Sequence, residues 1–210
     1  MEGREERARV RMGETKQGWA ARLFLWWLRG WYARQGWSEE RIIPTERKFV
    51  VIAAPHTSNW DFLYFLALAQ KLDVPLCFMG KSSLFRWPFG RFMREMGGIP
   101  VDRSGSHNMV DQMIAEFARR TTFMLTIAPE GTRGKVRQWK TGFYHIAMGA
   151  KVPLVCGLMD YAKKRGGLGP AIWPTGDYDK DMEKVSAYYR ACTPKYPEMG
   201  NAGLIAGDQG

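Results

Sequence analysis

The sequence is poor in the residues that build disulfide frameworks and metal sites. Only three cysteines and three histidines occur among its 210 residues. The cysteines are odd in number and far apart, and the histidines show no paired spacing. Both patterns argue against a disulfide framework and against a zinc site. We therefore expect no metal and no bound cofactor, and we expect reduced cysteines in the core of a cytoplasmic protein.

Long hydrophobic runs and two ligand motifs are also missing. No segment reaches the roughly 20 consecutive apolar residues that span a bilayer, and the charged N-terminus lacks the apolar core of a signal peptide. Gly80-Lys81-Ser82 follows a strand candidate, but Pro75 stands where a phosphate-binding P-loop needs its first glycine. No Gly-x-Ser-x-Gly pattern is present, which disfavours a serine hydrolase.

Negative charge is the scarcer sign. The chain has 31 Lys and Arg against 21 Asp and Glu, and the segment from Arg119 to Arg165 contains ten basic residues against only Glu130 and Asp160. Such a field suits nucleic acid, an anionic membrane surface or a phosphorylated substrate. Nucleic acid is disfavoured, because the chain has neither a basic helix nor an aromatic-studded strand pattern. A merely solvated basic face remains the alternative.

Apolar runs that alternate between strand-like and helix-like periods predict an α/β fold. We expect a mixed, mostly parallel central sheet flanked by helices. The clearest strand candidates are 49–54, 75–79, 121–127 and 152–158, and the clearest helix candidates are 62–68, 108–120, 141–149 and 179–191.

A Trp-rich amphipathic helix is predicted near the N-terminus, over residues 19–34. It carries Arg22 and Arg29 seven residues apart, on one stripe. Aromatic bulk with a few arginines is typical of a helix that lies in the lipid headgroup layer. The alternative is a helix that covers the core of the domain.

A histidine and an aspartate stand where a predicted strand passes into a predicted helix. His56 follows the run 49–54, and Asp61 falls in the first turn of a helix capped by Thr57, Ser58 or Asn59. A carboxylate bonded to one ring nitrogen fixes the imidazole tautomer and stabilises its cation, which leaves the other nitrogen as a base. His56 and Asp61 are therefore the candidate catalytic residues.

Two further candidates also follow strands, and the carboxyl ends of strands carry the ligand crevice of open α/β sheets. They are Arg103 and the run Glu130-Gly131-Thr132-Arg133. Arginine can bind phosphate through two hydrogen bonds, and glycine lets the backbone approach a ligand. A base without a nucleophile of its own suits direct attack by a bound hydroxyl on an activated acyl group. A plain charged turn is the alternative for residues 130–133.

These features together resemble the glycerophospholipid acyltransferase superfamily, which includes 1-acylglycerol-3-phosphate acyltransferases. All four sequence blocks of that family match in order, from about Phe49 to Leu158. The matching residues are His56 with Asp61; Lys81, Leu84, Trp87-Pro88-Phe89-Gly90 and Gly98-Ile99-Pro100-Val101-Asp102-Arg103; Pro129-Glu130-Gly131-Thr132-Arg133; and Val152-Pro153-Leu154-Val155.

The resemblance implies a role for each matched residue. His56 would be the general base and Asp61 its orienting partner. Arg103, Glu130, Gly131, Thr132 and Arg133 would bind the phosphate of the acceptor, and Lys81 would lie near the reaction centre.

The resemblance also implies an O-acyltransferase. It would move a fatty acyl group from acyl-CoA or acyl carrier protein, as co-substrate, to the hydroxyl of a lysophospholipid such as lysophosphatidate. The alternatives are transfer to another lipid or glycolipid hydroxyl and a catalytically silent lipid-binding peripheral membrane protein.

The implied location is cytoplasmic and peripheral, at the inner face of the cell membrane, with an anionic membrane surface and no nucleic acid as partner. The expected organisation is a charged tail and interfacial helix over 1–40, an acyltransferase domain over 41–192 and a loose C-terminal tail over 193–210.

Overall fold

A computed structural model describes residues 17–40, 42–101, 106–132, 134, 136 and 138–199. The strands are β1 (Ser38–Glu40), β2 (Lys48–Ala53), β3 (Leu76–Lys81), β4 (Gly98–Val101), β5 (Phe123–Ile127), β6 (Leu154–Asp160) and β7 (Arg165–Ile172). The helices are α1 (Trp19–Arg34), α2 (Asn59–Leu72), α3 (Gly90–Glu95), α4 (Ser106–Arg119), α5 (Gly142–Ala150) and α6 (Tyr178–Tyr189), with short 3-10 turns η1 (Ser82–Phe85) and η2 (Pro197–Met199).

The seven strands form one sheet in the order β1-β7-β6-β2-β5-β3-β4. Only β6 and β7 pair antiparallel, and every other neighbouring pair is parallel. This confirms the predicted mixed, mostly parallel sheet. The parallel strands β6, β2, β5, β3 and β4 all point their carboxyl ends to one edge, so the loops after them meet there.

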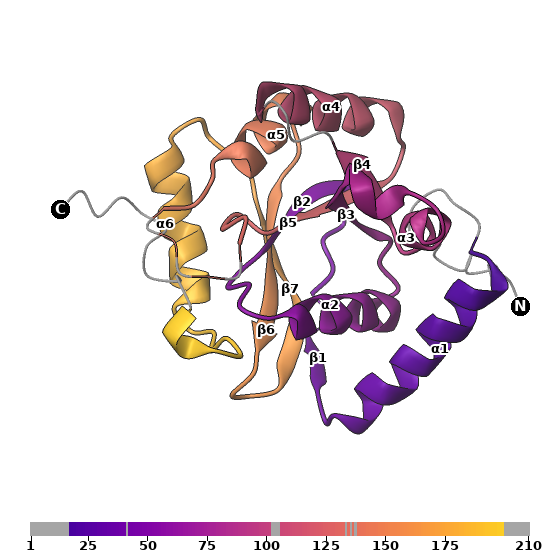
Figure 1. Ribbon diagram of the computed structural model, residues 1–210. Helices are drawn as coiled ribbons and strands as arrows, with labels where there is room; N and C mark the ends of the chain where they lie inside the picture. The colour runs from indigo at the N-terminus through magenta and orange to yellow at the C-terminus, as the bar shows by residue number, and fades with distance from the viewer. Residues whose placement is uncertain are drawn as a thin grey trace, which may run out of the picture.

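Helices cover both faces of the sheet (Figure 1). Because successive side chains of a strand point to opposite faces, β2 contributes to two cores. Val50 and Ile52 pack in a cluster with α4, α5 and α6, while Phe49 and Val51 pack in a cluster with α1 and α2. Both faces of β2 are therefore buried, which explains its continuous apolar run.

Strand β7 was not predicted, because its glycine-rich sequence reads as a loop. Its backbone pairs with both β6 and β1, so the strand is stabilised by ladder hydrogen bonds to its neighbours. A Cβ atom at Gly167 would meet the backbone oxygen of Glu40 at 2.7 Å. Here glycine permits the close approach of β1, which single-residue strand preference does not reveal.

The C-terminal segment also differs from its prediction as a loose tail. Its first part, 193–199, lies against the sheet edge that carries His56. The backbone N–H of Tyr161 donates to the carbonyl of Thr193 at 2.8 Å, and that of Tyr196 donates to the Thr57 hydroxyl at 3.3 Å. The rest of this predicted tail, 200–210, lies outside the described residues.

Helix α1 packs on α2 with one face and exposes aromatic side chains on the other. Ala21, Leu25, Leu28 and Tyr32 are buried, whereas Trp19 and Trp26 are 80% and 73% exposed. The core-covering alternative therefore describes the buried face of α1, while an interfacial role for the exposed face stays a prediction. Among the described residues, no helix is long and apolar enough to cross a membrane.

Candidate active site

The predicted histidine–aspartate pair forms at the carboxyl end of β2. The helix cap that the sequence left open is Ser58, whose hydroxyl accepts from the Trp60 N–H at 3.1 Å. Asp61, in the first turn of α2, completes the cap because its Oδ2 accepts from the Ser58 N–H at 2.8 Å and from the Thr57 N–H at 2.9 Å. The cap therefore holds the Asp61 carboxylate beside the loop that carries His56.

Asp61 contacts one ring nitrogen of His56. The Nδ1 atom lies 3.2 Å from Oδ2, and the His56 side chain keeps 23% of its surface exposed. Burial acts to raise the pKa of Asp61, but hydrogen bonds from His56, Tyr161 and Ser58 outweigh it and leave the pKa below its ordinary value. Asp61 is thus an anion at neutral pH, which places the imidazole proton on Nδ1 and leaves Nε2 as a proton acceptor.

Glu130 lies in the same site, but with a contact that differs from the predicted one. Its side chain is only 3% exposed, and its carboxyl oxygens accept the backbone N–H of His56 at 3.0 and 3.2 Å. A buried carboxyl whose two oxygens both accept a backbone N–H leaves little surface for a phosphate to contact. We infer that Glu130 supports the His56 loop.

Burial raises the pKa of Glu130 to about 8, the His56 N–H opposes this rise and the nearby Asp61 charge adds to it. The folded protein therefore holds this proton more tightly than the unfolded chain. Stability should fall by on the order of 4 kcal/mol as pH rises from about 4.5 to 8, because over this window the unfolded chain loses the proton while the folded protein largely keeps it. Glu130→Gln keeps an acceptor for His56 without this titration, so its loss of stability across the window should be smaller. Urea unfolding at pH 5 and pH 8 measures both slopes, and equal slopes would contradict this role.

Gly131 and Thr132 of the predicted phosphate loop are exposed at the same edge. Gly131 has a φ of +66°, in the left-handed region that favours glycine. A Cβ atom there would meet the Lys140 ammonium nitrogen at 3.0 Å, so this lysine lies directly over the loop. Thr132 is exposed, and its hydroxyl accepts the Gly134 N–H at 3.4 Å. Arg133 lies outside the described residues.

The two remaining predicted site residues, Lys81 and Arg103, belong to the end of β3 and to the segment after β4. Lys81 is exposed at the end of β3, in register with Val101 of β4. It lies at the same sheet edge as His56, two strands from β2. Arg103 follows β4 but lies outside the described residues. The described residues contain no cluster of three or more His, Cys, Asp and Glu side chains that could hold a metal ion.

Tyr161 is a site residue that sequence reasoning missed. It follows the end of β6, and its hydroxyl donates to Oδ1 of Asp61 at 2.6 Å. Burial and the neighbouring Asp61 carboxylate raise the pKa of Tyr161, so the phenol stays protonated as a donor. The sequence does place Tyr161 shortly after a predicted strand. That this strand lies next to β2 could be known only from the strand order of the sheet.

Comparison with known proteins bears on the family of this chain. A family model described as "Acyltransferase" matches residues 37–159. The chain is 30% identical over 112 residues to the 1-acyl-sn-glycerol-3-phosphate acyltransferase of Salmonella typhimurium, which covers 50% of this chain and 44% of that protein. It is 30% identical over 139 residues to the enzyme of the same name from Haemophilus influenzae, covering 61% and 56%. The chain thus spans about half the length of these curated relatives.

A solved structure shares the fold. The 1-acyl-sn-glycerophosphate acyltransferase PlsC from Thermotoga maritima superposes with a TM-score of 0.50 at 17% identity, covering 79% of this chain and 76% of that one. The family model spans more than half of the sequence and includes both His56 and Asp61. The chain therefore belongs to the acyltransferase family, within the glycerophospholipid acyltransferase superfamily that its four sequence blocks indicated.

Proposed function

We propose that this protein is an O-acyltransferase that moves a fatty acyl group from acyl-CoA or acyl carrier protein to the hydroxyl of a lysophospholipid such as lysophosphatidate. The observation that carries the proposal is the His56–Asp61 pair, 3.2 Å apart at the carboxyl edge of the sheet. The named relatives are 1-acylglycerol-3-phosphate acyltransferases, which supports the choice of acceptor.

In the proposed reaction His56 is a general base. Its Nε2 takes the proton of the acceptor hydroxyl while the hydroxyl oxygen attacks the thioester carbonyl carbon. The carbon–sulfur bond then breaks, and the imidazolium returns the proton to the leaving thiolate. Asp61 stabilises the imidazolium between these steps, so no residue of the protein needs to be acylated.

Phosphate recognition is proposed for the loops beside the pair. Arg103 and Arg133 would bind the acceptor phosphate, with Gly131 and Thr132 supplying backbone and hydroxyl contacts. Lys140 adds a cation directly over Gly131. Lys81, exposed at the same edge, would lie near the reaction centre.

Thiol release from palmitoyl-CoA by the purified protein tests this function. Release should depend on added lysophosphatidate and should yield phosphatidate as the lipid product, because the acceptor hydroxyl is the attacking group. Monoacylglycerol, which lacks the phosphate, is the matched control acceptor and should react much more slowly. Release at the same rate without any acceptor would identify a thioesterase and contradict the proposal.

We also propose that the protein acts at an anionic membrane surface, on the cytoplasmic inner face of the cell membrane. Exposed Trp19, Trp26 and Leu23 lie on α1 beside exposed Arg22 and Arg29. Tryptophan rings insert at the headgroup level and arginines attract anionic lipids.

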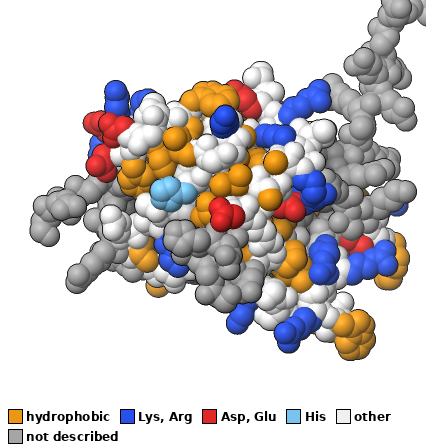
Figure 2. Space-filling model, turned by 90° about the horizontal axis from the view of Figure 1, so that it is seen from above, with side chains coloured by type: hydrophobic (Ala, Val, Ile, Leu, Met, Phe, Trp, Pro, Cys, Tyr) orange, Lys and Arg blue, Asp and Glu red, His pale blue; other side chains and the backbone are white. Residues whose placement is uncertain are grey.

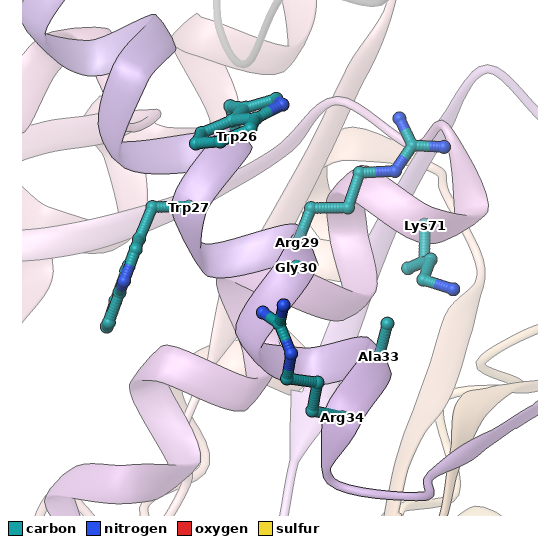
Figure 3. A pocket seen from close by; sticks show the side chains of 7 residues that line it. All are labelled: Trp26, Trp27, Arg29, Gly30, Ala33, Arg34 and Lys71. Atoms are coloured by element: carbon teal, nitrogen blue, oxygen red, sulfur yellow. The ribbon is translucent and has the colours of Figure 1, made fainter.

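A surface hollow along α1 combines the same two kinds of side chain. This cavity of about 610 Å³ is lined by Trp26, Trp27, Arg29, Gly30, Ala33, Arg34 and Lys71. Figure 3 shows Trp26 and Arg29 from α1 around the same hollow as Lys71 from α2. Lys and Arg side chains also lie over much of the right-hand side of the face seen in Figure 2. Both observations support attraction to anionic headgroups.

The double substitution Trp19→Ser and Trp26→Ser should weaken binding to vesicles of anionic phospholipid by on the order of a hundredfold. The estimate follows from about 1.5 kcal/mol or more for each large apolar side chain that leaves the interface. Vesicle co-sedimentation measures the change. Trp173→Ser removes an exposed tryptophan beyond β7 and is the matched control. Equal binding of the double variant and the wild type would assign α1 to the core alone.

A further inference from the structure

The Asp61 carboxylate has a hydrogen-bond donor that does not come from its own loop or helix. Three donors act on Oδ2: the His56 ring at 3.2 Å and the backbone N–H groups of Thr57 and Ser58. Among the residues that the structure describes, the Tyr161 hydroxyl is the one donor to Oδ1, at 2.6 Å. Asp61 is nearly buried, so solvent contributes little to holding this second oxygen. Tyr161 therefore fixes the side of the carboxylate opposite His56.

Tyr161 is itself held firmly by aromatic packing. Its ring lies edge-to-face on Trp37, with centroids 5.0 Å apart, and edge-to-face on Tyr64, at 5.7 Å. Edge-to-face pairs at such distances are favourable beyond the area that they bury. The ring therefore cannot turn away without breaking two packing contacts, which keeps its hydroxyl aimed at Asp61.

The C-terminal segment 193–199 closes the remaining side of Tyr161. The carbonyl of Thr193 accepts the Tyr161 backbone N–H at 2.8 Å. The ammonium of Lys195 lies 5.4 Å from the ring centroid of Tyr161 and 5.9 Å from that of Trp60, within the range of cation–π attraction. A cation on a phenol ring draws electron density from it, which strengthens the hydroxyl as a donor.

Three of the residues that make these contacts lie outside the matched part of the family. The family model ends at residue 159, whereas Tyr161, Thr193 and Lys195 lie beyond it. We propose that Tyr161 is a positioning residue of the reaction, a proposal that rests on the proposed function. Tyr161 orients Asp61 toward His56 from the side of the carboxylate opposite the His56 loop. The C-terminal segment is then part of the working site, because it holds Tyr161 in place.

Tyr161→Phe tests the proposal because it removes only the hydroxyl. We expect kcat to fall about tenfold while KM for palmitoyl-CoA and for lysophosphatidate stays within about twofold, since the residue touches neither substrate. Loss of the donor should also raise the pKa of Asp61 and move the acid limb of the kcat profile to higher pH. The titratable and charged groups around Asp61 are His56, Tyr161 and the Glu130 carboxyl, with Lys195 behind the phenol ring. The Tyr161→Phe variant alters only the phenol among them.

Tyr32→Phe is the matched control. Tyr32 belongs to the same aromatic cluster, through ring contacts with Trp37 and Tyr64, but its hydroxyl has no contact with Asp61. Its kcat and acid limb should equal those of the wild type. The proposal is overturned if Tyr161→Phe also behaves like the wild type, or if Tyr32→Phe loses as much activity as Tyr161→Phe does.

A spectroscopic readout separates this proposal from the proposed function. The low-field proton NMR signal of the His56 Nδ1–H reports its hydrogen bond to Asp61 and needs no substrate. It should shift in Tyr161→Phe and stay in place in Tyr32→Phe. An unchanged signal in both variants would reject the positioning role, even if wild-type protein transfers acyl groups. A shifted signal supports that role, even if lysophosphatidate is not the acceptor.

Discussion

His56→Ala is expected to lower acyl transfer to lysophosphatidate by at least about a thousandfold. The variant lacks the imidazole, which is the group proposed to take the hydroxyl proton as the oxygen attacks. The alanine keeps the backbone N–H that Glu130 accepts, so the loop itself should persist. Single-turnover and steady-state rates with palmitoyl-CoA and lysophosphatidate measure the loss.

His145→Ala is the matched control for that experiment. His145 lies exposed on α5, outside the loop and helix that carry His56 and Asp61. It should retain wild-type rates, and both variants should melt within a few degrees of the wild type. Transfer that survives in His56→Ala would show that His56 is not the base.

Asp61→Asn is expected to lower kcat by on the order of a hundredfold to ten-thousandfold. The amide oxygen can still accept the Ser58 and Thr57 N–H groups and so keep the cap. The amide nitrogen then takes the place of Oδ1 and faces Tyr161, while the oxygen that still faces His56 no longer carries a full negative charge. Without that charge the imidazolium that forms as the hydroxyl proton is removed is less stable, so the variant should fold normally but transfer slowly.

The Asp177→Asn variant makes the same chemical change at another helix cap. Asp177 caps α6 by accepting the Lys180 N–H at 3.2 Å, and asparagine caps helices about as well as aspartate. Its activity and melting temperature should match the wild type. If Asp61→Asn is equally active, the carboxylate charge contributes nothing to the reaction.

Most of the central sheet could be predicted from sequence because its strands are buried on both faces. The runs that became β2, β3, β5 and β6 are continuously apolar, and such runs are read directly from composition. The strands β1 and β7 could not be predicted this way. Their residues form strands because neighbours supply a ladder and because Gly167 lets two backbones approach closely.

The contact between His56 and Asp61 was equally accessible to sequence reasoning. His56 and Asp61 are five residues apart, on a strand end and the helix that follows, so local geometry alone brings them together. The role of Glu130 was not accessible. Its inward contact with the His56 backbone depends on β5 lying beside β2, whereas the family resemblance implied a phosphate contact.

The sequence by itself determined the family, the α/β fold class and the pairing of His56 with Asp61, because each depends on residues close together in the chain. Only the tertiary structure decided what surrounds that pair. Glu130 stands 74 residues from His56, and Tyr161 stands 100 residues from Asp61. Contacts over such separations are set by strand order and packing of the whole sheet. No local pattern in the chain encodes them separately.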